Sequence, residues 1–347
     1  MMDQDRFLEI LEGFAAVRLA VMGDFFLDKY LVLDPALTEI SLETGLEAFQ
    51  VVAVRHSPGA AGTVTANLAA LQVAALHAIG VAGDDGHGYE LRQGLQRSGV
   101  NMTHLLTLEE IFTPTYTKPM VIQPNGSEVE SNRVDIRNRR PLSEAVQERL
   151  VASLEQVLPE VDGVILADQV SEPQLGVITP YVRDRVAEIA AAHPEVVFFA
   201  DSRANIGEFR QVIIKPNRRE AALCLGVADE SAVTAGQLAE RGRELAARNG
   251  RPVFITLGPE GMLACTAEAA TPVPGIPVSG PLDIVGAGDS ATAGTVAALC
   301  AGATVPEAAL FGNLVASITV QQIGTTGTAT PGQVLQRYLD TCGEGAS

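Results

Sequence analysis

Short apolar runs alternate with longer amphipathic stretches along most of the chain. Uninterrupted apolar runs that end in polar or glycine residues are typical of strands buried on both faces of a parallel sheet. Their alternation with helical patterns predicts a three-layer α/β/α fold with a mostly parallel central sheet, whose ligands bind at the carboxyl ends of the strands. The predicted strands cover residues 17–24, 163–168, 195–201, 211–217 and 252–258, and the predicted helices cover 143–158, 178–193 and 234–250.

Two segments, residues 29–57 and 111–136, break this pattern because apolar and polar positions alternate in them, and PNGS at 124–127 is a hairpin-turn signal. They predict a small β lid. Neither a long Pro/Ser linker nor an internal repeat occurs, so residues 1–347 are interpreted as a single domain into which the lid is inserted. A lone small sheet cannot bury its apolar faces, which predicts a homodimer through the lid.

The charge balance excludes one class of partner. The chain has 24 Lys and Arg against 42 Asp and Glu, a formal net charge of −18. That field repels a polyanion, so no nucleic-acid partner is expected. A phosphorylated ligand would have to be bound by backbone N–H groups, helix N-termini or metal ions, which supply a local positive field.

Cysteine spacing and the apolar stretches indicate the compartment. The four cysteines lie far apart without a C-x-x-C pair, which argues against a disulfide framework or a zinc site and suits a reducing cytoplasm. The N-terminal segment lacks the basic start and apolar run of a signal peptide. Polar residues and glycines interrupt the Ala-rich stretches, so these are predicted to be buried helices rather than membrane spans. We therefore expect a cytoplasmic protein without membrane contact.

The sharpest chemical signal is a Gly-rich turn, Gly286–Ala287–Gly288, that runs into Asp289 and a strongly helical stretch. Small residues let the backbone approach an anion, and a helix start presents unpaired N–H groups to it. Such a cradle would stabilise charge on a transferring phosphoryl group, while Asp289 accepts the proton of an attacking hydroxyl. The alternative is that Asp289 caps the helix and the glycines form a plain turn.

This stretch resembles the D-T-x-G-A-G-D signature of the ribokinase (phosphofructokinase-B) family of carbohydrate kinases, with Ile284 in place of the threonine. Six ordered matches cover nearly the whole chain. The resemblance implies a ribokinase-like fold and an ATP- and Mg²⁺-dependent kinase that phosphorylates a hydroxyl of a sugar-like substrate. The other five matches are GDFFLDKY (23–30), PGAAGTVTANLAAL (58–71), VAGDDGHG (81–88), KPNRREA (215–221) and TLGPEGM (256–262).

The resemblance also assigns roles to individual residues. It implies that Asn217 and Glu220, the N-x-x-E motif, hold Mg²⁺ through water, and that Asp283 orders a loop that binds a monovalent cation such as K⁺. The 322–328 loop is expected to border adenine and that cation. The expected substrate residues are Asp28, Gly59, Ala60, Thr63 and Lys118, and the expected ATP-binding residues are Asn217, Thr256, Gly258, Gly261 and Asn313.

Several of these assignments have structural alternatives. Asp28 could instead cap a turn before the lid, Asp24 could be the structural aspartate, and Asn217 with Glu220 could form a helix cap. Lys118 and Arg133 are candidates to hold a substrate phosphate, but charges on a small sheet are more often simply solvated.

Within the family, the resemblance is strongest to the heptose-7-phosphate kinases of ADP-heptose synthesis. It rests on EISLETGLEAFQVV (39–52), TPTYTK (113–118) and SITVQQIGTTGTATP (317–331). The H-x-G-H motif of the nucleotidyltransferase domain that some of those enzymes carry is missing, so that second activity is not expected. The chain departs from the pattern at Ala60 (for glycine), Thr63 (for asparagine), Glu39 (for arginine), and at Thr44 and Gly45 in the lid entry, which puts the heptose phosphate in doubt.

Two other function classes compete with an active kinase. The changes at Ala60 and Thr63 fit a kinase-fold protein that binds a nucleotide or metabolite without turnover. The α/β alternation alone fits a dinucleotide-dependent dehydrogenase, but the N-terminal G-x-G-x-x-G fingerprint is missing. The intact Gly286–Asp289 segment favours the kinase, because a pure binder needs no base.

Overall fold

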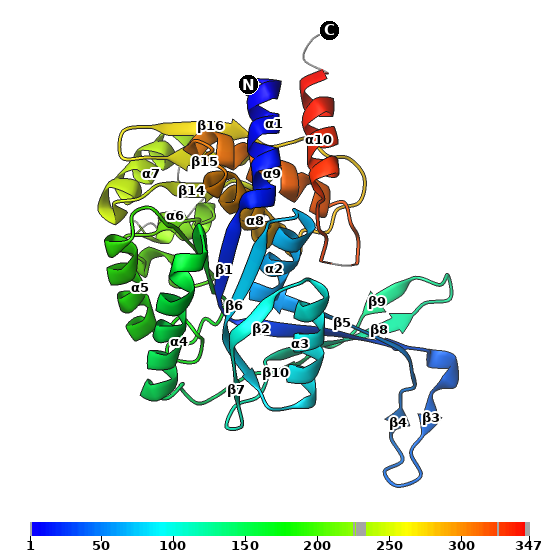
Figure 1. Cartoon of the computed structure of the whole chain (residues 1–347). Coiled ribbons are helices and arrows are strands. Elements are labelled where there is room, and N and C mark those ends of the chain that lie inside the picture. Colours follow the sequence, from blue (N-terminus) through cyan, green and yellow to red (C-terminus); the bar gives the residue numbers. More distant parts are fainter. Residues whose placement is uncertain (1, 225, 227–233, 325, 344–347) are drawn as a thin grey trace.

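A computed structural model describes residues 2–224, 226, 234–324 and 326–343. Its middle layer is a nine-stranded sheet in the order β16-β15-β14-β13-β12-β11-β1-β6-β7 (Figure 1). The strands from β14 to β7 pair in parallel, whereas β15 and β16 are antiparallel, so the predicted mostly parallel sheet is confirmed. The strands are β1 (Arg18–Gly23), β6 (Ala75–Gly83), β7 (Asn101–Leu108), β11 (Gly163–Asp168), β12 (Val197–Ser202), β13 (Ile213–Ile214), β14 (Val253–Thr256), β15 (Gly261–Cys265) and β16 (Ala270–Pro274).

Helices cover both faces of this sheet, so the strands have to be apolar on both sides. In β1, Leu19 and Val21 belong to one buried cluster, whereas Ala20 and Met22 belong to the other. One face carries α1 (Gln4–Gly13), α2 (Ala61–Ala70), α3 (Gly86–Arg97), α8 (Ala287–Cys300), α9 (Val305–Thr319) and α10 (Pro331–Gly343). The other carries α4 (Glu144–Val157), α5 (Pro180–Ala192), α6 (Arg218–Cys224) and α7 (Ala235–Asn249).

Most predicted elements agree with these bounds. The exception is the strand predicted at 211–217, which the structure limits to Ile213–Ile214. Pro216 has no N–H to continue a regular ladder, so the strand ends before it and only an isolated bridge from Asn217 to Thr256 follows. Short 3₁₀ helices join several elements: η1 (Phe14–Ala16), η2 (Pro35–Leu37), η3 (Leu158–Glu160), η4 (Ile206–Glu208) and η6 (Gly258–Glu260).

A second sheet forms from the two segments predicted to make a lid. Its strand order is β10-β8-β2-β5, with β9 pairing to β8, and Figure 1 shows it projecting from the three-layer body together with the hairpin β3–β4. In the first segment the strands start slightly before the predicted residue 29 and end slightly after the predicted residue 57. Its strands are β2 (Phe25–Leu33), β5 (Val51–Ala60), β8 (Thr115–Ile122), β9 (Glu128–Glu130) and β10 (Val134–Ile136), and the hairpin is β3 (Glu39–Ile40) and β4 (Glu47–Ala48).

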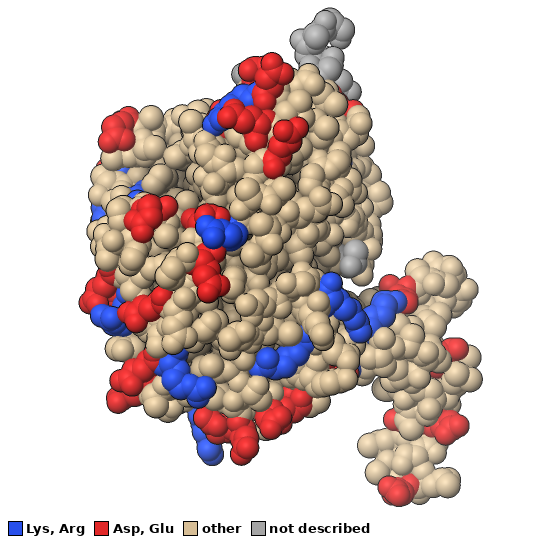
Figure 2. Space-filling view, in the orientation of Figure 1, with Lys and Arg blue, Asp and Glu red and all other residues tan. Residues whose placement is uncertain are grey.

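Surface charge is unevenly distributed on the face shown in Figure 2. Acidic side chains are spread over the body, whereas several basic ones gather where the second sheet leaves it. Among the described helices, none has the length and apolar character needed to cross a bilayer.

Candidate active site

A pocket of about 190 Å³ lies where the second sheet meets the start of α8. It brings together most of the residues predicted for catalysis and substrate binding, although they come from distant parts of the sequence. Those predicted residues are Asp28, Ala60, Thr63, Lys118, Gly286 and Asp289. The remaining lining residues are Phe26, Tyr116, Arg133, Gln169, Arg203, Val285 and Thr326.

Helix α8 begins at Ala287, so Asp289 lies in its first turn rather than at the N-cap. The N-cap is Gly286, whose backbone is left-handed (φ +79°). A Cβ there would lie 2.9 Å from the Thr326 Cγ2 atom, which explains the glycine. Within the described residues the Asp289 carboxylate accepts no hydrogen bond, so the helix-cap alternative is wrong.

The backbone N–H groups at this helix start form the predicted cradle. The Ala287 N–H donates to the Ile284 carbonyl (3.2 Å) and is therefore engaged in the turn. The N–H groups of Gly286 and Gly288 donate to no acceptor in the part of the chain that the structure describes. These two groups, together with the helix dipole, make the start of α8 suited to an anion.

The electrostatic environment raises the pKa of Asp289 to about 7. Burial is the main cause, and the negative charges of Asp201 and Asp28 act in the same direction, while Lys215 and Arg203 oppose it. A carboxylate with this pKa exchanges a proton readily at neutral pH, as a general base must.

Asp28 and Lys118, which also line this pocket, form an ion pair with Oδ1 and Nζ 3.1 Å apart, in which Lys118 is buried and Asp28 partly buried. Lys118 also donates to the Tyr30 hydroxyl (3.2 Å). Burial lowers the pKa of Lys118, but Asp28 and Tyr30 raise it more, so the ammonium stays charged. Lys118 is only 9% exposed, so the alternative of a solvated surface charge is wrong for this residue. A Cβ at Gly59 would lie 2.5 Å from Asp28 Oδ2, which explains that glycine.

Arg133 and Tyr116 form one wall of the pocket. The Arg133 guanidinium stacks 4.3 Å from the centre of the Tyr116 ring and pairs with Asp135 (2.7 Å). Phe26 contacts the same ring edge-on. The charge of Arg133 is therefore already paired with Asp135, unlike that of a residue dedicated to binding a phosphate.

Ala60 and Thr63, the two departures from the family pattern, stand at the start of α2. Ala60 has φ 54° and ψ −117°, a conformation that costs an L-residue about 1–3 kcal/mol. Glycine would adopt it without strain. Thr63 is buried, and its methyl group lies 3.5 Å from the position of a Cβ at Gly286. The two residues thus shape the pocket floor.

Asp24 is structural, in agreement with the alternative considered for it. Its buried carboxylate accepts backbone N–H bonds from Gln169 (2.8 Å), Val170 (3.0 Å) and Val177 (2.7 Å). Burial nevertheless raises the pKa of Asp24 to about 6. The residue holds the loop after β11, which delivers Gln169 to the pocket.

Asn217 and Glu220 bond reciprocally at the start of α6, each side chain accepting from the other's backbone N–H (2.8 Å). The helix-cap alternative is therefore correct, but it uses only one carboxylate oxygen of Glu220. Both residues line a pocket next to the active site, and burial raises the pKa of Glu220. Mg²⁺ is usually held by one or two carboxylates with phosphates and water, and these residues fit that mode.

The other predicted nucleotide residues lie beyond this pocket. The Thr256 N–H bonds the Pro216 carbonyl (3.0 Å), and Gly258 (φ +61°) follows β14 in open space. At Gly261 a Cβ would overlap the chain end of β16, so packing alone explains the glycine. The Asn313 amide donates to the carbonyls of residues 273 and 274 (3.1 and 3.0 Å), which fixes β16 on α9 and gives Asn313 a structural role.

Asp283 joins two loops beside the glycine-rich turn. Its Oδ1 accepts from the Val285 N–H and its Oδ2 from the Gly324 N–H, both at 3.1 Å. This geometry suits the predicted role of ordering the loop rather than direct coordination. Residue 325 of the 322–328 loop lies outside the described residues.

Sequence reasoning missed Lys215, Arg203, Gln169 and Tyr116. Lys215 is buried, pairs with Asp201 (3.0 Å), and lies 3.7 Å from the position of a Cβ at Gly288. The sequence position of Lys215 could have identified it, since it stands two residues before the N-x-x-E motif. Among the described residues, no cluster of three or more His, Cys, Asp or Glu side chains is arranged to hold a metal ion.

The sheet order, the second sheet and the pocket at the start of α8 define a ribokinase-like α/β protein. Solved structures agree on the fold. A putative phosphofructokinase from Staphylococcus aureus superposes with a TM-score of 0.71 at 20% identity, covering 92% of this chain and 95% of its own. Arabidopsis thaliana ribokinase, complexed with ribose and ATP, gives 0.66 at 20% identity, covering 93% and 98%.

The chain belongs to the pfkB family of carbohydrate kinases, whose model matches residues 30–331. Among curated relatives, the bifunctional protein HldE of Nitratiruptor sp. is 30% identical over 317 residues, which is 90% of this chain. HldE of Caulobacter sp. is 32% identical over 323 residues, 92% of this chain. The chain spans 63% of the length of each of these relatives.

Proposed function

We propose that this protein transfers the terminal phosphoryl group of ATP to a hydroxyl of a sugar or sugar phosphate, with Asp289 as the base. One observation carries the proposal. Asp289, whose pKa is raised to about 7 and whose carboxylate has no hydrogen-bond partner within the described residues, shares a pocket with the Asp28–Lys118 ion pair. An ionisable group left without a structural partner suits catalysis better than binding without turnover.

In the proposed reaction the acceptor hydroxyl gives its proton to the Asp289 carboxylate while its oxygen attacks the terminal phosphorus of ATP. The bond from that phosphorus to the bridging oxygen breaks, and ADP leaves with the bonding electrons. The N–H groups of Gly286 and Gly288 stabilise charge on the transferred group, and Asp28 and Lys118 bind polar groups of the acceptor. Asn217 and Glu220 would hold Mg²⁺ through water, and the ion would neutralise phosphate charge.

The HldE relatives favour a heptose 7-phosphate as the acceptor. Glu39, the departure that places an acid where a base is expected, lies exposed in β3 on the projecting hairpin and does not line the pocket. It therefore does not repel a phosphate bound in the pocket of its own chain. The need for ATP, and the free thiols of Cys224, Cys265 and Cys300, suit the cytoplasm.

The test is ADP release with Mg·ATP across a panel of sugars, sugar phosphates and nucleosides. We expect sugars or sugar phosphates, and no nucleoside, to stimulate release well above the rate without acceptor. Nucleotide binding without stimulated release by any acceptor would contradict the proposed function. Repeating the assay with and without KCl tests the monovalent cation.

We also propose a homodimer through the second sheet. Its exposed apolar side chains have no cover within the described residues, and burying them would favour association. Light scattering at micromolar concentration is expected to give twice the chain mass of 36.4 kDa. A monomer would contradict the proposal. On the sheet these side chains include Val52, Val54, Val129 and Val134, and the adjoining β3–β4 segment adds Ile40, Leu46 and Phe49.

A further inference from the structure

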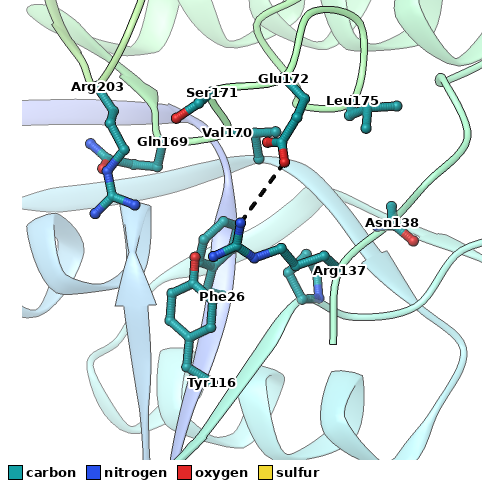
Figure 3. A pocket seen from close by; sticks show the side chains of 11 residues that line it. Phe26, Tyr116, Arg137, Asn138, Gln169, Val170, Ser171, Glu172, Leu175 and Arg203 are labelled. Carbon is teal, nitrogen blue, oxygen red and sulfur yellow. Dashed lines mark ion pairs between the residues drawn. The ribbon is translucent and has the colours of Figure 1, made fainter. Parts of the chain in front are cut away.

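Arg203, the residue after β12, stands where three pockets meet. It lines the active-site pocket, the neighbouring pocket that contains Asn217 and Glu220, and a smaller pocket beside the second sheet. Figure 3 shows this last pocket, with the Arg203 guanidinium extending from the chain into it on the side where Gln169 lies. The guanidinium is therefore placed between the predicted acceptor site and the predicted Mg²⁺ and phosphate site.

Among the cations that line the active-site pocket, Arg203 differs in lacking a partner. Within the described residues its side chain makes no ion pair and donates no hydrogen bond. All five guanidinium donors remain available to a ligand. The other two cations of this pocket are paired, Lys118 with Asp28 (3.1 Å) and Arg133 with Asp135 (2.7 Å). Lys215, close to Gly288, pairs with Asp201 (3.0 Å).

The chain at Arg203 is held firmly although its side chain is unpaired. The Arg203 N–H donates to the Asp168 carbonyl (2.9 Å). The Asp168 carboxylate in turn accepts from the Ser202 hydroxyl (2.6 Å) and the Asn205 amide (3.1 Å), one residue before and two residues after the arginine. This network fixes the base of the side chain and so reduces the cost of ordering it around a ligand.

We propose that Arg203 is a further catalytic residue, which contacts the phosphoryl group as it passes from ATP to the acceptor hydroxyl. The inference rests on the proposed phosphotransfer. During transfer, negative charge spreads over the three equatorial oxygens of the group. The planar fork of a guanidinium matches two such oxygens, which a lysine does not. Arg203 stays protonated throughout, while the acceptor proton goes to Asp289.

Three variants test this role: Arg203→Ala, Arg203→Lys, and the control Arg243→Ala. Arg243 is exposed on α7 and makes no ion pair or hydrogen bond within the described residues, so its loss removes the same charge far from the pocket. We expect Arg203→Ala to lower kcat by ~10²–10³-fold, as for the loss of one transition-state donor. The kcat of Arg203→Lys should lie between those of Arg203→Ala and the wild type. Added guanidinium should restore part of the kcat of Arg203→Ala, and the kcat of Arg243→Ala should equal that of the wild type.

The pH profile gives a readout that a purely structural role would not move. The positive charge of Arg203 lowers the pKa of Asp289. In Arg203→Ala the acid limb of kcat/KM is therefore expected to shift to higher pH, and in Arg243→Ala it should stay in place.

Two results would overturn the inference. One is an unchanged kcat in both Arg203 variants, and the other is a raised acceptor KM with unchanged kcat, which would make Arg203 an acceptor-binding residue. Either result leaves the proposed function intact, because the wild type would still release ADP. The proposed function itself fails only if the wild type releases none with any acceptor.

Discussion

Replacing Asp289 by asparagine is expected to lower kcat by ~10²–10⁴-fold, the usual contribution of a general base. Asparagine keeps the size of the side chain but cannot accept the proton. ATP affinity should change little, because the N–H groups of Gly286 and Gly288 remain. Folding should also survive, since the carboxylate of Asp289 accepts no hydrogen bond within the described residues.

The melting temperature of this variant provides a second check with a definite sign. The folded-state pKa of Asp289, about 7, lies above its ordinary value. Such a group stabilises the fold fully at low pH, and this contribution is lost as pH rises through about 7. Above that pH the ionised carboxylate destabilises the wild type, so Asp289→Asn should melt at an equal or higher temperature at pH 8.

We expect to measure kcat by steady-state kinetics with the acceptor that the screen identifies. Nucleotide binding and thermal melts at pH 8 on the wild type and the variant measure the other two effects. Asp184→Asn is the matched control, because Asp184 is exposed on α5 and makes no ion pair or hydrogen bond within the described residues. Its kinetics should equal those of the wild type. If Asp289→Asn kept its kcat, Asp289 would not be the base.

Substituting alanine for Gly286 is expected to lower kcat by about 10²-fold, the effect of losing one well-placed backbone donor. Gly286 has φ +79°, and a Cβ would lie 2.9 Å from Thr326 Cγ2. The turn has to move to relieve both strains, and its N–H groups then no longer point at the transferred phosphoryl group. Stability should also fall by about 1 kcal/mol, because alanine resists a positive φ.

Gly302→Ala separates the two effects. Gly302 lies just past the other end of α8 with φ +85°, and a Cβ there would meet nothing within 4 Å. This variant should lose a similar amount of stability and keep its kcat. Denaturant unfolding and kinetics on both variants make the comparison. Equal kcat values for the two would mean that the Gly286 backbone does not act in catalysis.

Much of the architecture was predictable because strands buried on both faces need uninterrupted apolar runs. The candidate catalytic motif was equally visible, since an anion cradle at a helix start requires small residues, and these stand in sequence next to the proposed base. The two lid segments differed from the rest of the chain because apolar and polar positions alternate in them, which is the pattern of a sheet with one face in water.

What the sequence did not predict depends on side-chain direction and tertiary contacts. Arg203 and Gln169 stand in irregular segments, where no periodicity says which way a side chain points. Gln169 reaches the pocket because Asp24, which is distant in sequence and lies between β1 and β2, holds its loop. Asn313 matches a nucleotide residue by motif, but the nearby end of β16 engages its amide.

The composition of the pocket has a consequence for protein synthesis. Its walls come from residues as early as Phe26 and as late as Thr326, and α8, which carries Asp289, packs against α9 through Ser290 and Thr319. In a nascent chain the residues around Asp28 and the second sheet are therefore synthesised long before Asp289. The pocket, and with it the phosphotransfer that we propose, cannot be complete until nearly the whole chain has been made.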